Sequence, residues 1–171
     1  MGQTASISRS SVLSAVVIAI LLAALPSAIR RIIQTGNPYL FTHDFFADLL
    51  ARLSGPGKMR FIMQPTVAIV LGARDGVKDA RAGLPPFIWA LLFHGAHRPG
   101  MLRNMFASLR NLVAIAILLD VVSQFLIFRE IHPGAALLLG PVLIALPYAL
   151  SRATTNRITR RRGQTPATST S

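Results

Sequence analysis

One acidic residue lies in the middle of a long apolar segment of this chain. Asp120 is at the midpoint of 112–128, and Ser123 and Gln124 share its helical face three and four residues later. An acidic side chain at the centre of a bilayer costs about 2.5 to 3.5 kcal/mol, and no second charge within the apolar segments is its obvious partner. A polar path for protons or cations would use such a carboxylate. The alternative is a carboxyl group that fastens one helix to its neighbours.

A second group of charged residues follows a short apolar segment and comprises Arg74, Asp75, Lys78, Asp79 and Arg81. Two carboxylates four residues apart on a helix can hold a divalent cation, and neighbouring cations can hold a phosphate. This chemistry would suit a membrane enzyme acting on a phosphorylated lipid. The other interpretation is a solvated stretch at the cytoplasmic surface, in which a lysine or arginine offsets the aspartates.

Other kinds of chemistry have little support in the sequence. The chain has no cysteine, which excludes disulfides, thiolate metal sites and a cysteine nucleophile. His94 and His97 are interpreted as an ordinary surface pair, because no carboxylate lies within ten residues of them. We identify no catalytic residue, expect no cofactor and no metal, and lean against an enzyme.

The composition indicates a membrane protein. Of 171 residues, 52% are hydrophobic and 14% are charged, against about 25% charged in soluble domains. The formal net charge of +12 would also suit a nucleic-acid binder, but so apolar a chain would be insoluble outside lipid. The composition therefore predicts an integral membrane protein without a nucleic-acid partner.

Three apolar segments are long enough to cross a bilayer, which takes about 20 helical residues. They cover 12–29, 112–128 and 133–150, whereas a fourth, 61–73, is short for a comfortable span. Only Arg9 precedes the first segment, whereas Arg30 and Arg31 follow it directly, which favours a retained helix over a cleaved signal peptide. We therefore expect an all-α bundle with three transmembrane helices, and with residues 1–150 as a single membrane-embedded domain.

The distribution of positive charge predicts an orientation. With three spans, 16 of the 18 Lys and Arg residues lie on one side, whereas four spans would place 12 inside and 6 outside. The positive-inside rule thus favours three spans, an external N-terminus and a cytoplasmic C-terminus.

Cytoplasmic amphipathic helices and a basic tail complete the expected organisation. Thr42 is a plausible N-cap for a helix that ends before Gly55, and a second helix runs from Pro99 into the second span. Residues 151–171 are basic and then rich in Thr, Ser and Pro, so we expect a disordered cytoplasmic tail attracted to anionic lipid head groups.

Small residues mark the expected helix contacts. Lipid gives helices no hydrophobic reason to associate, so close approach over small side chains is the usual route to contact. The first apolar segment carries one at every fourth position, and the third repeats the spacing once: Ser11, Ala15, Ala19, Ala23 and Ser27, then Ala136 and Gly140. These strips predict a homo-oligomer or a membrane protein partner.

One stretch of the chain carries a set of Gly, Asp, Pro and aromatic residues. The pattern is Phe61-x-x-Gln64-Pro65-x-x-Ala68-x-x-x-Gly72-x-Arg74-Asp75-Gly76-x-x-Asp79-Ala80, followed by Pro85-Pro86-Phe87-x-Trp89. It resembles a sequence found in small bacterial multi-pass membrane proteins with no assigned activity. The resemblance runs from about Arg60 to Ile158. It implies a location in the inner (plasma) membrane of a bacterium and adds no mechanism.

These patterns favour a non-catalytic accessory or scaffold that acts through helix–helix contacts. The alternatives are a subunit of a small oligomeric transporter or channel that uses Asp120, Ser123 and Gln124, and a membrane enzyme that uses Asp75 and Asp79.

Overall fold

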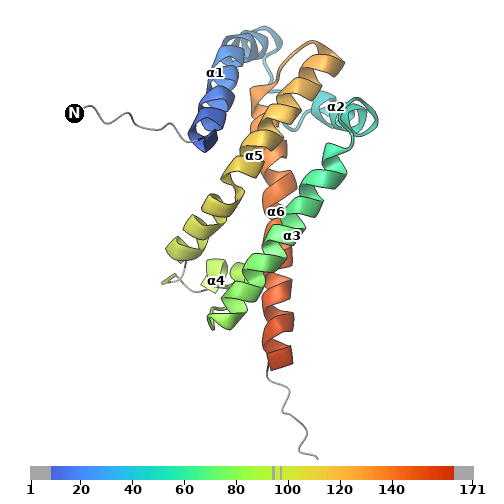
Figure 1. Ribbon diagram of the computed structural model, residues 1–171. Helices are drawn as coiled ribbons and strands as arrows, with labels where there is room; N and C mark the ends of the chain where they lie inside the picture. Colours follow the sequence, from blue (N-terminus) through green and yellow to red (C-terminus); the bar gives the residue numbers. More distant parts are fainter. Residues whose placement is uncertain (1–8, 94, 97, 164–171) are drawn as a thin grey trace, which may run out of the picture. The chain divides into compact units, whose positions relative to one another are not determined.

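The described part of the chain is built from helices alone (Figure 1). The computed structural model describes residues 9–93, 95–96 and 98–163, so His94 and His97 lie outside it. The prediction of an all-α fold is confirmed. The six helices are α1 (Arg9–Thr35), α2 (His43–Ser54), α3 (Arg60–Arg81), α4 (Phe87–Phe93), α5 (Arg98–Phe128) and α6 (Pro133–Gly163).

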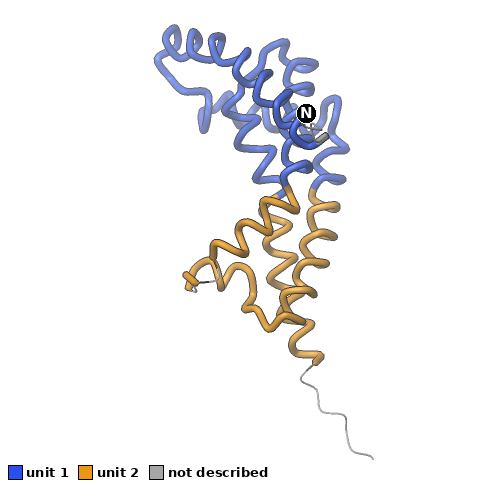
Figure 2. Tube along the Cα trace, turned by 60° about the vertical axis from the view of Figure 1, so that its left-hand side comes forward, with its two compact units in different colours: residues 1–64, 110–144 blue, residues 65–109, 145–171 orange. Residues whose placement is uncertain are grey.

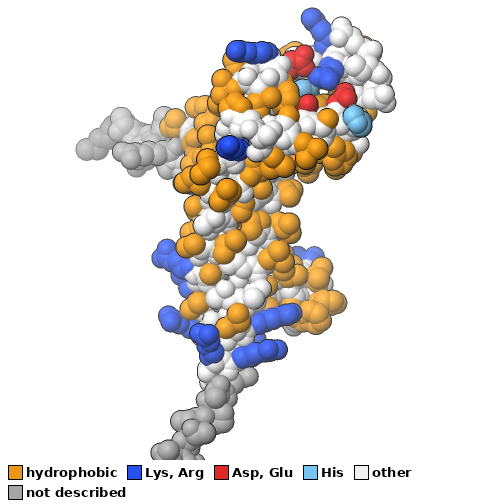
Figure 3. Space-filling model, turned by 90° about the vertical axis from the view of Figure 1, so that its right-hand side faces the viewer, with side chains coloured by type: hydrophobic (Ala, Val, Ile, Leu, Met, Phe, Trp, Pro, Cys, Tyr) orange, Lys and Arg blue, Asp and Glu red, His pale blue; other side chains and the backbone are white. Residues whose placement is uncertain are grey.

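Three of these helices are long and apolar enough to cross a membrane. The candidate spans are Ser10–Thr35 in α1, Arg98–Phe128 in α5 and Pro133–Gly163 in α6. They contain the three segments predicted from the sequence, and α5 runs into its span without a break, as expected. The short segment 61–73 belongs to the 22-residue helix α3, which is not among the three candidate spans. Apolar side chains cover much of the molecular face drawn in Figure 3.

The expected disorder after residue 150 is wrong for 151–163, where α6 continues to Gly163. Three arginines in the last turn of α6 favour this continuation, because cations stabilise the negative end of the helix dipole. Arg152 and Asn156 also make contacts to the rest of the chain from within this stretch. Residues 164–171 of the expected tail lie outside the described part.

The chain divides into two compact units rather than one domain (Figure 2). Unit 1 comprises 1–64 and 110–144, and unit 2 comprises 65–109 and 145–171. Helices α3, α5 and α6 contribute residues to both.

The core of unit 1 joins α1, α5 and α6. Val17 of α1 packs with Ile117 and Val121 of α5 and with Ala136 of α6. Gly140 lies against the backbone of Ile117, where a larger side chain would crowd α5. Small residues thus allow α5 and α6 to approach closely in this unit.

Contacts at both ends of α1 show that α1 and α5 run parallel in unit 1. Near the beginning of α1, the Ser10 hydroxyl accepts a hydrogen bond of 2.6 Å from Arg110, where α5 enters unit 1. Near their ends, Arg31 pairs with Glu130 at 2.7 Å. The two helices therefore point in the same direction, and α6 returns antiparallel after the short connection 129–132.

Unit 2 is built on close contact between α3 and α6. Gly72 lies against the backbone of Tyr148, and Gly76 lies against the backbone of Arg152. A Cβ atom at either glycine would overlap a carbonyl oxygen of α6, so only glycine permits this approach. Phe87 of α4 is 1% exposed and lies in the apolar core beside this contact.

Candidate functional site

Asp120 lies buried in unit 1 beside two arginines. Its carboxylate is 2.7 Å from Nη2 of Arg60 and 3.8 Å from Nη1 of Arg52. Gln124 Nε2 donates to the same carboxylate at 2.6 Å. The sequence offers Asp120 no charged partner within the apolar segments, and the structure supplies two from outside them.

The two arginines reach Asp120 from outside the long apolar segments. Arg52 is on the inward face of α2, and Arg60 is the first residue of α3, where it also donates to the carbonyl of Leu119 at 2.9 Å. Nε and Nη1 of Arg52 have no hydrogen-bond partner among the described residues. Asp120 is therefore engaged on both oxygens within unit 1 and is not an open site for a cation. The side chain of Ser123, a transport candidate, lies within 3.4 Å of the Pro56 carbonyl, to which it donates.

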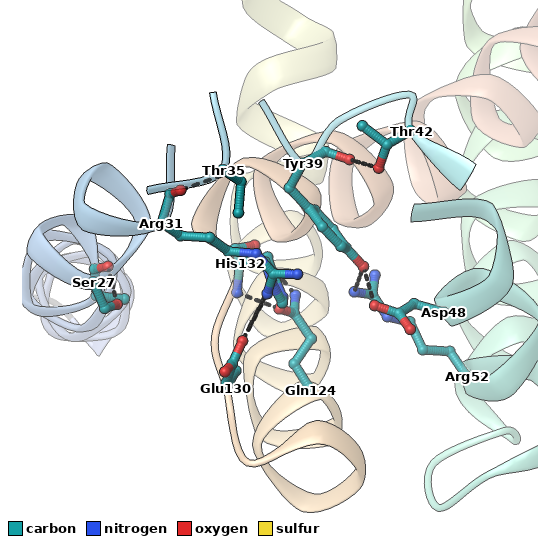
Figure 4. A network of polar contacts seen from close by, with 11 residues as sticks. Ser27, Arg31, Thr35, Tyr39, Thr42, Asp48, Arg52, Gln124, Glu130 and His132 are labelled. Atoms are coloured by element: carbon teal, nitrogen blue, oxygen red, sulfur yellow. Dashed lines mark hydrogen bonds and ion pairs between the residues drawn. The ribbon is translucent and has the colours of Figure 1, made fainter. Parts of the chain in front are cut away.

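A second set of polar contacts extends this cluster toward the segment between α1 and α2 (Figure 4). The Tyr39 hydroxyl donates to Asp48 at 2.5 Å and accepts from Arg52 at 3.3 Å. Burial, together with the hydrogen bond to Asp48, raises the pKa of Tyr39 above its usual value, so the hydroxyl stays protonated. Arg52 thus contacts both the Tyr39–Asp48 pair and Asp120.

His132, between α5 and α6, connects the cluster to α1 (Figure 4). Its Nε2 is 2.7 Å from Nη1 of Arg31, and its ring stacks on Tyr39 at 3.8 Å between centroids. Arginine can only donate, so Nε2 accepts and the ring proton lies on Nδ1. Burial and the positive charge of Arg31 lower the pKa of His132, and Glu130 opposes this shift. His132 is therefore neutral at pH 7.

In unit 2 the charged residues of α3 divide between buried and exposed positions. Asp79 is 5% exposed and accepts two hydrogen bonds from Arg152, 2.6 Å from Nε and 3.0 Å from Nη2. Arg74 and Arg81 are exposed. The interpretation of 74–81 as a solvated stretch is thus wrong for Asp79, whose partner lies on α6.

Asp75, one helical turn before Asp79, also contacts other helices in unit 2. It accepts hydrogen bonds from Tyr148 at 2.7 Å and from Ser108 at 3.0 Å. Lys78 lies 3.4 Å away on the same helix, as the charge-offset interpretation expected.

The polar residues of α6 follow the spacing of those on α3. Tyr148, Arg152 and Asn156 recur every fourth residue, so they form one row on α6. Asn156 continues the row by donating to the Leu84 carbonyl at 3.1 Å. Sequence reasoning missed this row because it placed Tyr148 in an apolar span and the other two in a tail. The four-residue spacing of Tyr148, Arg152 and Asn156 was the sequence pattern that could have revealed this row.

In both units the carboxylates of the candidate residues connect different helices. The carboxylates of Asp75, Asp79 and Asp120 all accept hydrogen bonds from neighbouring side chains. Among the described residues, no group of three His, Cys, Asp or Glu side chains could hold a metal ion.

The small-residue strips lie in two different environments. The five residues of the strip on α1 are all exposed, because α1 packs within unit 1 through Val17 and Ala24 instead. On α6, Ala136 is fully buried and Gly140 contacts α5. The strip on α1 therefore makes no core contact in the described chain.

The fold and these contacts define an all-helical protein with three helices long and apolar enough to span a membrane, whose buried charges join its helices. Comparisons with family models, with curated proteins and with solved structures each find no match for the chain.

Proposed function

We propose that this protein is a non-catalytic accessory or scaffold protein of a membrane, which acts through helix–helix contacts made by α1. The observation that carries the proposal is the exposure of the strip on α1. Only 11% of the apolar window of α1 is buried, against 39% for α5 and 28% for α6. Helix α1 is thus the span with the most surface left for a second protein, and small side chains let another helix approach it closely.

The contacts of the buried charged residues support the same function, because they argue against the two alternatives, a transporter and a membrane enzyme. A transporter needs a carboxylate that can bind and release its ion, but Asp120 is held by Arg60, Arg52 and Gln124. A phosphotransfer site needs carboxylates directed at a cation, but Asp79 is directed at Arg152. Each of these residues is used to join helices.

Cysteine cross-linking along α1 tests the proposal, because the chain has no cysteine of its own. Single cysteines at Ala15, Ala19 and Ala23 sample the strip, and Ile18 and Leu25 are exposed positions on its flanks. In native membranes, oxidation should join two copies through the strip positions if the partner is a second copy. If the partner is a different membrane protein, a benzophenone attached to the same cysteines should cross-link to that protein.

The flanking positions are the matched control. Strong cross-linking at the three alanines with weak cross-linking at Ile18 and Leu25 supports a defined helix contact. Equal yields at all five positions, or no product with either reagent, would contradict the proposal.

We further propose that α3 crosses the membrane, which gives four crossings instead of the three expected from hydropathy. Helices α1 and α5 run parallel in unit 1, so residues 36–109 must return from the end of α1 to its beginning. A non-helical segment cannot cross lipid without leaving backbone groups unsatisfied. Helix α3 begins beside Asp120, within the depth of the α5 span, and its 22 residues, about 33 Å in length, can complete this return.

Four crossings put both termini on the same side, and the positive-inside rule then makes that side cytoplasmic, in place of the external N-terminus expected from three spans. Of the 18 Lys and Arg residues, 12 lie on the cytoplasmic side and 6 on the other. Three of the six, Arg31, Arg52 and Arg60, pair with Glu130 or Asp120. These ion pairs reduce the positive charge on the outer side and make the arrangement compatible with the rule.

The resemblance to small bacterial membrane proteins fits this proposal. Four residues of the shared pattern, Gly72, Asp75, Gly76 and Asp79, contact α6 in unit 2. We propose that the pattern records a helix contact common to these proteins, and that the membrane is the bacterial inner membrane.

A further inference from the structure

Helix α2 has an inverted distribution of polar and apolar side chains. Its inward face carries Phe45, Asp48 and Arg52, and two of these three are charged. Phe46, Leu50 and Leu53 lie on one exposed flank of α2 and are 53%, 67% and 46% exposed, whereas the exposed polar residues His43, Asp44 and Ser54 lie at the two ends of the helix. A helix on a water-facing surface shows the opposite pattern, with its apolar stripe toward the core.

The charges on the inward face are held in place by specific contacts. Arg52 contacts Asp120 and the Tyr39 hydroxyl, and Asp48 accepts from Tyr39. The Thr42 hydroxyl accepts from the Phe45 backbone N–H at 3.3 Å and fixes the beginning of the helix. The outward direction of the three apolar side chains therefore follows from the polar contacts on the other face.

The end of α2 lies beside the interior of the α5 candidate span. Gly55, which ends α2, packs against Ile127, and the Ser123 hydroxyl lies 3.4 Å from the Pro56 carbonyl. Ser123 is more than one helical turn inside the end of α5 at Phe128. At this depth α5 itself exposes Phe125 and Leu126.

We propose that α2 is embedded in the bilayer at the level of the last turns of α5, with Phe46, Leu50 and Leu53 against lipid acyl chains. The apolar outward face of α2 then continues the lipid-facing surface of the last turns of α5. Burying apolar surface in lipid stabilises this inverted pattern by about 25 cal/mol per Å² relative to water. The charged inward face stays inside unit 1, where the charges pair with one another.

Spin labels test this location directly. Single cysteines replace Phe46, Leu50 and Leu53 in turn, and the labelled full-length protein is reconstituted into phosphatidylcholine and phosphatidylglycerol vesicles. Collision with oxygen, which concentrates in lipid, should exceed collision with a water-soluble nickel chelate at all three positions. Ile18→Cys on α1 is the lipid-facing control, and Arg81→Cys is the water-facing control.

Two outcomes would overturn the proposal. Nickel collisions exceeding oxygen collisions at the three positions would place the face in water. Low collision rates with both reagents would mean that a protein covers the face. Thermal unfolding of each labelled variant identifies a misfolded one, and the other two positions then carry the test. The result is independent of the cross-linking of α1, because α2 and the strip residues are labelled separately.

Discussion

Arg152 of α6 holds Asp79 of α3 through two hydrogen bonds, and the two residues are only 1% and 5% exposed. The guanidinium also lies 4.6 Å above the ring of Phe87 and donates to the Tyr148 hydroxyl at 3.1 Å. One arginine therefore contacts α3, α4 and α6 within unit 2. The close approach at Gly72 and Gly76 brings these helices near enough for the pair to form.

Removing one member of this pair should strongly destabilise unit 2. Arg152→Met leaves the Asp79 carboxylate buried without its partner, which costs about 3 to 5 kcal/mol for a buried pair. We expect a large fall in the thermal unfolding temperature in mild detergent. The double variant Asp79→Leu with Arg152→Met should recover much of the loss, because no buried charge then remains unpaired.

The exposed Arg74→Met is the matched control for that series and should leave the unfolding temperature nearly unchanged. If the double variant were less stable than Arg152→Met alone, the charge pair would not be the source of the effect.

A methyl group at the α3–α6 contact should separate the two helices. Gly76→Ala would place a Cβ against the Arg152 carbonyl oxygen, so backbone must move, and the expected cost is about 1 to 3 kcal/mol. Gly100→Ala adds the same methyl group where nothing lies within 4 Å. The thermal unfolding temperature should fall for Gly76→Ala and stay unchanged for Gly100→Ala. Equal unfolding temperatures for the two variants would mean that α3 and α6 do not approach closely at Gly76.

The sequence predicts the helices of this protein far better than their contacts. An apolar segment of about 20 residues identifies a span by itself, since the lipid sets the required length. Partner choice depends instead on residues far apart in the chain, such as Asp79 and Arg152, which are separated by 73 positions. Arg152 follows the last apolar segment, so composition alone assigned it to a disordered tail.

Helix periodicity has a related limit. The spacing around Thr42 correctly predicts a helix and its N-cap. It cannot say which face turns inward, because that depends on a partner such as Asp120 in a distant segment. An apolar face toward water and an apolar face toward lipid look the same in a sequence.

Neutralising Asp120 should disrupt unit 1. Asp120→Asn would leave Arg52 and Arg60 buried without a carboxylate between them, and we expect a loss of about 3 kcal/mol or more by thermal unfolding. Asp44→Asn, at an exposed position of α2, should have little effect. If Asp120→Asn abolished proton flux in liposomes and left unfolding unchanged, the transporter hypothesis would replace the structural role.

Acidification should destabilise the protein through His132. Its pKa is lowered in the folded protein, so the unfolded chain binds a proton more readily as the pH falls through about 6.5. Protonation would also remove the acceptor for Arg31 and place two positive charges side by side. The unfolding temperature should therefore fall between about pH 7.5 and pH 5.

His132→Gln should reduce this pH dependence, whereas His43→Gln should keep it, because the His43 side chain is 97% exposed. A wild-type unfolding temperature that rises on acidification would have the wrong sign for a buried neutral histidine.

Four crossings predict which sites are labelled from the same side of the membrane. Single cysteines at Asn37 and Glu130 should react together with an impermeant maleimide in intact cells, because Arg31 and Glu130 mark one end of unit 1. Cysteines at Gly83 and Arg157 should react only after the membrane is opened, because α3 carries the chain back across before Gly83. If α3 does not cross, Asn37 and Gly83 lie on the same side and Glu130 on the other. Labelling of Asn37 and Glu130 from opposite sides would contradict the parallel arrangement of α1 and α5, and labelling of Asn37 and Gly83 from the same side would contradict the crossing of α3.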